Sequence, residues 1–402
     1  MNALRYTDTD TYTTACRLFM GLLFALLSGA ASAHKASDAY VLLKQASSSA
    51  PVQANLAIAL RDLDRVFESL DANNDRALTF AEVKATLPDI ERWAGLGLGL
   101  QCGAQTIALA WKFEALEERS DGVFVRLAST STATCNPLQH PSHSMQLRYT
   151  LMQDVDADHR AIVSWSWQGG SLGHQGSAAI KPSEALQPLG ANLANPSEAN
   201  ETDANSSALA TLKSFVALGI SHIGSGADHI AFIICLVLTL ALSMAREWKA
   251  LLMTITAFTL GHSITLISAT YGWVGSPRWV EPVIALSIAI SATFNLIKPR
   301  LSSLQSPWLS AALAASFGLV HGLGFSGAMT EAQLPEGSLI WALLGFNIGV
   351  EIGQLLIIAA WALIYWALHR WKHYQSIIVQ GGSVALILLA MYWFVERLGI
   401  LL

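Results

Sequence analysis

The second half of the chain consists of apolar stretches, each about as long as a helix must be to cross a lipid bilayer. Crossing takes about 20 mostly apolar residues in a helix. The stretches cover residues 211–243, 250–271, 280–297, 307–328, 338–368 and 376–400. We therefore predict an all-α polytopic membrane bundle of about six helices over residues 209–402.

The charges in the loops predict how this bundle is oriented. Basic residues follow the first, third and fifth predicted spans, namely Arg246, Lys249, Lys298, Arg300, Arg370 and Lys372. The alternate loops carry only Arg278 or are acidic at Glu331 and Glu336. Because basic loops stay in the cytoplasm, the segment ahead of the first span is predicted to lie outside the membrane.

Residues 1–33 have the features of a cleaved secretion signal. Arg5 and Arg17 supply positive charge, residues 18–27 form a short apolar core, and residues 31–33 are Ala-Ser-Ala, a cleavage pattern. The apolar core is too short to cross a bilayer. The signal exports whatever follows it, so it places the next domain on the same side as the loop charges do.

The exported segment, residues 34–181, has the pattern of a β-rich domain. Apolar or alternating segments of strand length, separated by turn-forming residues, occur at residues 105–111, 122–129, 145–153 and 161–167. A helical pattern over about residues 62–98 interrupts them. Residues 182–208 are rich in Pro, Asn, Ser and Ala without periodicity, which predicts a linker. The whole chain is thus predicted to be a multi-domain protein.

The cysteines indicate one disulfide. Cys16 lies in the signal and Cys235 in a predicted span, which leaves Cys102 and Cys135 in the exported domain. An oxidising compartment permits a bond between these two. The alternative is a pair of buried thiols.

Residues 71–82 match the twelve-residue loop of a calcium-binding EF-hand. The expected ligands are Asp71, Asn73, Asp75, the carbonyl group of Ala77, Thr79 and, closing the site, Glu82. Arg76 stands at the sixth position, where glycine normally makes a sharp turn. We therefore expect weak calcium binding, near the millimolar range of exported modules. The alternative is a helix hairpin without an ion.

Ionisable side chains occur inside the predicted spans, where they are costly and usually functional. Imidazole and carboxylate groups together suit transition-metal ions. The candidate metal ligands are His222, Asp228, His229, His262, His321 and Glu351, and Glu281 lies at the start of the third span. The alternative is that these groups only form hydrogen bonds to neighbouring helices.

The first span holds two of these histidines in an unusual setting. On an unbroken helix His222 and His229 would be two turns, or about 10 Å, apart, which is too far to bind one ion. Gly224 and Gly226 lie between them and allow the helix to break, as helices around transported ions do. A break would bring His222, Asp228 and His229 around one cation or along one path.

Small residues surround the other candidates. His262 and His321 each lie among small residues, which leave room for a ligand or for a second helix. In the fifth span, Asn347, Glu351 and Gln354 share one helix face, and glycine recurs at Gly345, Gly349 and Gly353. That glycine pattern favours close helix contact. We interpret Glu351 as a charge partner for a cation, whereas structural hydrogen bonding explains Asn347 and Gln354 equally well.

The His-x5-Asp-His pattern of residues 222–229 resembles the signature of the HupE/UreJ membrane proteins, which are nickel permeases in several bacteria. The segments around His262 and His321 and residues 347–354 resemble the branch of that family with a large exported N-terminal domain. The resemblance covers the membrane half and implies divalent-metal transport in a bacterial inner membrane. The chain departs from the permeases at Ala328, where they have a glutamate.

Other function classes lack their sequence features. The net charge of -5 and the absence of a basic stripe argue against nucleic acid. The chain has neither a phosphate-binding glycine loop nor a helical His-Glu-x-x-His, so we expect no enzyme. We predict a permease for nickel or a similar divalent metal, embedded in the lipid bilayer, with a calcium-binding exported domain. The alternative is a membrane-anchored metal or calcium sensor, or an assembly factor for metalloproteins, that transports nothing.

Overall fold

The computed structural model describes residues 38–47, 50–75, 78–103, 105–119, 122–134, 145–156, 159–167, 174–189, 201–240, 244–275, 277, 279–297, 306–331 and 334–399. The predicted signal peptide, Arg76, Ala77 and Cys135 lie outside these residues. The chain divides into two compact units, which are described separately. One comprises Ala36–Leu218 and Gly327–Phe346, and the other comprises Gly219–Ser326 and Asn347–Leu402.

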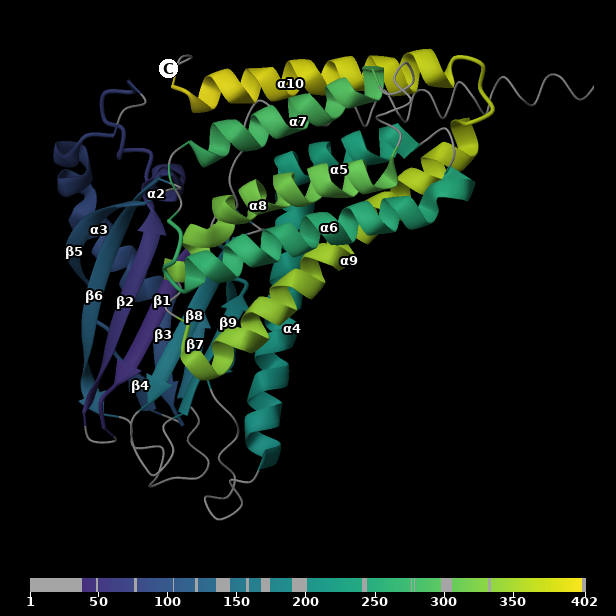
Figure 1. The fold of residues 1–402 in the computed structure, drawn as a ribbon. Helices are drawn as coiled ribbons and strands as arrows, with labels where there is room; N and C mark the ends of the chain where they lie inside the picture. Colours follow the sequence, from purple (N-terminus) through teal and green to yellow (C-terminus); the bar gives the residue numbers. More distant parts are fainter. Residues whose placement is uncertain are drawn as a thin grey trace, which may run out of the picture. The chain divides into compact units, whose positions relative to one another are not determined.

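The first unit contains a six-stranded sheet whose strands neighbour one another in Figure 1. Their spatial order is β5 (Lys112–Arg119), β6 (Gly122–Thr134), β2 (Pro51–Ala59), β1 (Asp38–Gln45), β8 (Arg160–Trp167) and β9 (His174–Ile180). All neighbours are antiparallel except β1 and β8, which run parallel in unbroken register from Asp38 opposite Arg160 to Gln45 opposite Trp167. The first strand therefore lies at the middle of the sheet.

A second sheet of four strands has the order β10 (Ser183–Leu189), β7 (Met145–Tyr149), β3 (Leu98–Cys102) and β4 (Gln105–Ile107), all antiparallel. In β3 and β7 every second residue is buried, because successive side chains on a strand point to opposite faces. Leu100, Leu147 and Trp165 belong to one apolar core shared by strands of both sheets. The predicted β-rich character of this region is confirmed.

Two helices, α2 (Leu60–Val66) and α3 (Phe80–Gly97), account for the predicted helical segment. Val83, Ile90 and Ala94 of α3 are fully buried, and their spacing places them on one helical face against the core. Thr79 caps the start of α3 and Glu82 returns the contact, which forms a capping box.

The segment predicted as a linker has structure at both of its ends. Strand β10 pairs with β7, from Ser183 opposite Tyr149 to Leu189 opposite Met145, and helix α4 already begins at Glu201. Residues 190–200 lie outside the described residues. The sequence did not predict β10, because most of its side chains are exposed and its residues therefore show no apolar alternation.

The predicted membrane spans are helical in the structure. Among the described residues, six helices are long and apolar enough to cross a membrane: Ala208–Ser225, Trp248–Thr270, Val280–Ile297, Pro307–Phe325, Gly337–Leu368 and Tyr374–Arg397. The helices that contain them are α4 (Glu201–Ser225), α6 (Met244–Thr270), α7 (Val280–Ile297), α8 (Pro307–Glu331), α9 (Glu336–Leu368), and η4 (Tyr374–Gly381) followed by α10 (Gly382–Arg397). This confirms the predicted all-α membrane half.

The first predicted span differs in detail because it consists of two helices. Helix α4 ends at Ser225, and α5 (Ala227–Leu240) begins after Gly226. Glycine destabilises the interior of a helix because it loses the most backbone conformational entropy on folding. The interruption therefore falls at one of the two glycines where we predicted a break.

Helices α6 and α8 touch through glycines. A Cβ atom added to Gly318 would lie 2.1 Å from the carbonyl oxygen of Phe258, and one on Gly261 would lie 2.2 Å from that of Ala315. On Gly322 it would lie 2.4 Å from the carbonyl oxygen of His262. The small residues around His262 and His321 thus make room for a second helix, which was one of our two interpretations.

Candidate metal centre

Four of the predicted site residues gather in the membrane half. His222 lies near the end of α4, His229 in α5, His262 in α6 and His321 in α8. The ring centres of His222 and His229 are 4.6 Å apart, those of His229 and His321 are 5.4 Å apart, and His262 is 6.4 Å from both His222 and His229. Imidazoles that share one ion through bonds of about 2.0–2.1 Å have ring centres roughly 5 Å apart. The His222–His229 and His229–His321 spacings are close to this value, whereas the two spacings of His262 are longer.

The interruption at Gly226 brings the first two rings together. The Gly226 N–H donates to the carbonyl oxygen of His222 at 3.0 Å, and Ile230 N–H donates to that of Gly226 at 3.0 Å. A Cβ atom on Gly226 would lie 2.7 Å from Nδ1 of His229 and 2.8 Å from the carbonyl oxygen of His222. Only glycine leaves room here for the His229 ring.

Phenylalanine rings surround the histidines. Phe325 lies 4.4 Å from the His222 ring centre, and Phe258 and Phe232 lie 5.2 and 5.4 Å from that of His321. His262 and His321 are buried, with exposed fractions of 0% and 2%, whereas His222 and His229 are partly exposed. The Nε2 atoms of His222 and His229 are nevertheless buried, so the partial exposure of these two residues does not extend to those ring nitrogens.

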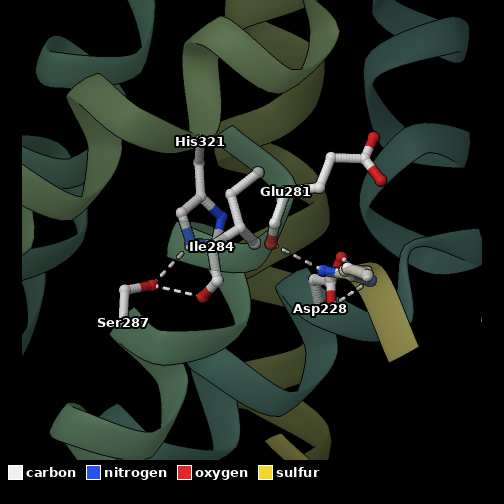
Figure 2. A network of polar contacts seen from close by, with 6 residues as sticks. Asp228, Glu281, Ile284, Ser287 and His321 are labelled. Atoms are coloured by element: carbon white, nitrogen blue, oxygen red, sulfur yellow. Dashed lines mark hydrogen bonds and ion pairs between the residues drawn. The ribbon is translucent and has the colours of Figure 1, made fainter. Parts of the chain in front are cut away.

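A serine determines which ring nitrogen of His321 carries the proton. Ser287 Oγ donates its single proton to the carbonyl oxygen of Ile284 at 2.7 Å, so it accepts from Nε2 of His321 at 3.1 Å (Figure 2). The neutral ring then carries its proton on Nε2 and a lone pair on Nδ1. Metal-binding histidines usually donate their second ring N–H in this way.

Two buried ring nitrogens remain unused within the part of the chain that the structure describes. Nδ1 of His321 and Nε2 of His229 have no hydrogen-bond partner there. Leaving such a group without a partner costs about 1–3 kcal/mol, which is seldom retained without a reason. These two atoms are the clearest candidates for binding a ligand.

The side chains do not form a finished coordination sphere. Among the described residues, no group of three or more His, Cys, Asp and Glu side chains is placed to hold a metal ion as it stands. The four rings are near one another, but they are not arranged as the ligands of one ion. Some rings must turn before they can bind one ion together.

Asp228 is engaged elsewhere. Both of its carboxylate oxygens accept hydrogen bonds from Nη2 of Arg397, at 2.9 and 3.0 Å. Nη1 of Arg397 donates to the carbonyl oxygen of Glu281 at 3.2 Å (Figure 2). Sequence reasoning missed Arg397, although it lies in a predicted span and an arginine there needs a counter-charge as much as an aspartate does.

Glu351 also faces a partner on another helix. Thr256 of α6 donates to Oε1 of Glu351 at 3.1 Å. Its neighbours on the same face behave alike, since Ser263 donates to Asn347 at 2.7 Å and Thr259 donates to Gln354 at 3.2 Å. The polar face of α9 therefore pairs with the hydroxyl groups of α6, which fits the structural interpretation of Asn347 and Gln354.

The loop of residues 71–75 forms turns of its own. The Asp75 N–H donates to Oδ1 of Asp71 at 3.2 Å and to Oδ1 of Asn73 at 2.8 Å. Positive φ occurs at Asn74, whereas Arg76 and Ala77 lie outside the described residues. The Glu82 carboxylate accepts from the Thr79 hydroxyl at 2.6 Å, and this bond lowers the pKa of Glu82. Glu82 is thus ionised at neutral pH, and its carboxylate already accepts hydrogen bonds from Thr79 in the capping box of α3.

Cys102, at the end of β3, is disulfide-bonded. Cys135, the partner that we predicted, lies outside the described residues. Cys235, in α5, is a buried thiol that is not part of a disulfide.

Residues 198–397 match the family model described as HupE/UreJ protein. The membrane half of this chain belongs to the HupE/UreJ family. The match includes the four histidines of the cluster, whereas strands β1 to β10 precede it. No curated protein and no solved structure matches the chain significantly. The HupE/UreJ family suggests a membrane role related to nickel or cobalt transport, and the chain is accordingly a multi-pass membrane protein.

Proposed function

We propose that this HupE/UreJ protein is a permease for a divalent transition-metal ion, nickel or cobalt, and that His222, His229, His262 and His321 form its path. The convergence of these four rings from four helices carries the proposal. Neutral imidazoles bind nickel, cobalt and zinc well. The buried, unused nitrogens of His229 and His321 supply two of the lone pairs that an arriving ion needs.

The order of exposure suggests the order of steps. In this proposal an ion meets His222 and His229, the two partly exposed residues, before it passes to the buried His262 and His321. Transport requires sites that bind well enough to admit the ion and weakly enough to release it. A cluster in which rings must turn to complete the coordination meets both conditions, because the ion exchanges one ligand at a time.

Asp228 and Glu351 have supporting roles in this proposal. Each carboxylate already accepts hydrogen bonds, from Arg397 and from Thr256 respectively. The charge of Asp228 is balanced by Arg397, and in this proposal neither carboxylate replaces the imidazoles as a ligand.

We also propose that the protein lies in a bacterial inner membrane with the β-rich unit outside. The loop charges and the signal-like N-terminus favour a bacterial inner membrane with the β-rich unit outside. A disulfide between Cys102 and Cys135 suits that compartment. The loop of residues 71–82 would bind calcium weakly there.

Removing one ring of the cluster tests the path. His229→Ala is expected to lower nickel or cobalt uptake into proteoliposomes on the order of 10–100-fold, the range typical of damaged metal sites. The matched control is His369→Ala, because His369 is exposed directly after α9 and, among the described residues, its ring contacts only the Tyr365 ring and the carbonyl oxygens of Tyr365 and Trp366. Uptake should be unchanged in this control.

Two results would contradict the proposal. If His229→Ala reaches the membrane in normal amount and transports like the wild type, the histidines do not form the path. If the wild type binds nickel through His229 but moves none across the vesicle membrane, the protein is the sensor or assembly factor instead.

Calcium binding has its own test on the full-length protein. Calorimetry is expected to show binding near the millimolar range, and Glu82→Gln should abolish it because the closing ligand loses an ionised oxygen. Asp89→Asn is the matched control, since Asp89 lies on the same helix and only pairs with the exposed Arg92. A heat of binding that survives Glu82→Gln would exclude this loop as the site.

A further inference from the structure

An ion pair between Asp228 and Arg397 joins two helices of the membrane half, with Nη2 of Arg397 2.9 Å from Oδ2 of Asp228. Asp228 is at the start of α5, next to His229, and Arg397 is the last residue of α10. Their side chains are only 22% and 14% exposed. A carboxylate and a guanidinium in membrane spans are retained when they pair with each other and have a function.

Several contacts hold Arg397 in this position. Besides the two bonds to Asp228, it donates to the carbonyl oxygen of Glu281, and its guanidinium lies 5.7 Å from the ring centre of Trp393. Helix α10 packs along α7, which carries Glu281 (Figure 1). The guanidinium is thus fixed from two helices, and it keeps both oxygens of Asp228 directed toward itself.

The same stretch of α7 also serves the histidine cluster. Glu281 receives the bond from Arg397, and Ser287, less than two turns further along, accepts the bond from His321 (Figure 2). Asp228 thus directly precedes His229 of the cluster, and Arg397 links it to α7, which also contacts His321. Both of its carboxylate oxygens, however, accept hydrogen bonds from Arg397.

This arrangement affects which cations the cluster accepts. A set of imidazoles alone suits nickel, cobalt, copper and zinc, whereas manganese, magnesium and calcium favour carboxylate oxygens. A free carboxylate of Asp228 beside His229 would add an oxygen ligand and a negative charge. Its engagement by Arg397 leaves the cluster neutral and rich in nitrogen.

We propose that Arg397 is a specificity-determining residue, which keeps the Asp228 carboxylate out of the cation site so that imidazoles alone select the metal. This inference rests on the proposed function, because it assumes that the histidine cluster binds the transported ion. Arg397 acts through Asp228, so it is a positioning residue and not a ligand.

The test compares nickel and manganese binding by the purified full-length protein, with each metal added alone in calorimetry. Arg397→Met is expected to raise manganese affinity and to lower the ratio of nickel to manganese affinity by at least about 10-fold. Arg397→Lys keeps the charge but cannot make the same set of planar contacts, so we expect a smaller shift in the same direction. A loss of stability alone would weaken both metals and would not increase the affinity for either.

The double variant Asp228→Asn/Arg397→Met is the matched control. It removes the carboxylate that would reach the metal, so the gain in manganese affinity should disappear while nickel binding persists. If Arg397→Met does not fold, the ratio of nickel to manganese affinity is measured for Arg397→Lys instead, and an unchanged ratio would exclude the role of Arg397.

Two outcomes overturn different claims. If the variants fold and bind nickel with the wild-type ratio of affinities, the role of Arg397 is excluded and the permease proposal stands. If the wild type binds neither nickel nor cobalt, the proposed function fails, and this inference fails with it.

Discussion

Replacing Gly318 by alanine is expected to destabilise the membrane half by about 1–3 kcal/mol, the cost of overpacking a tight contact. The added methyl group would lie 2.1 Å from the carbonyl oxygen of Phe258. Backbone cannot move aside as a flexible side chain does, so α6 and α8 must separate. Because these helices carry His262 and His321, metal affinity should fall together with stability. Unfolding by detergent titration and nickel calorimetry on the same sample measure both effects.

Gly381→Ala is the matched control for this change. Gly381 is also in a predicted span, but a Cβ atom there would be 3.7 Å from the nearest atom, the carbonyl oxygen of Ser376, an ordinary contact. We expect no loss of stability in this variant. Equal unfolding midpoints for Gly318→Ala and Gly381→Ala would contradict the close approach of α6 and α8.

Gly226→Ala is expected to weaken metal binding on the order of 10–100-fold while most of the fold is retained. A methyl group there would lie 2.7 Å from Nδ1 of His229 and 2.8 Å from the carbonyl oxygen of His222. Either the His229 ring or the end of α4 has to shift, and both movements separate the first two rings of the cluster. Calorimetry with nickel measures the affinity, and circular dichroism measures the helix content.

Gly224→Ala provides a closely matched comparison. It lies two residues away, and a Cβ atom on Gly224 would meet no atom within 4 Å. Alanine is the better helix former by roughly 0.5–1 kcal/mol, so this variant should be as stable as the wild type or slightly more stable. Should Gly224→Ala impair metal binding as much as Gly226→Ala does, the space at Gly226 is not what positions His229.

The sequence predicted the membrane half well because its signals are local. Apolar length alone identified the spans, since lipid requires it of every spanning helix. The cost of burying imidazole in a span singled out His222, His229, His262 and His321, which the structure brings together. The helix break at Gly226 was also predictable from local sequence, because the effect of a glycine on a helix depends only on its own backbone.

The partners of the candidate residues could not be predicted in this way. Arg397 pairs with Asp228, which is far away in the sequence, and Ser287 contacts His321 from another helix. Such contacts depend on how helices pack, and many serines and threonines in the spans are equivalent in sequence alone. Thr256 shows the same limit, because nothing local distinguishes it as the donor to Glu351.

The parallel pairing of β1 with β8 determines when the β-rich unit can fold during synthesis. Strand β1 is made early, but one of its edges has no neighbour until β8, which contains Trp165 and Trp167, has followed. Pairing between distant segments slows folding, and an open strand edge promotes association between chains. A fragment that stops before β8 therefore leaves the middle of the sheet exposed as an edge. Such a fragment will tend to aggregate, and a soluble form of this unit has to extend through β8 and β9.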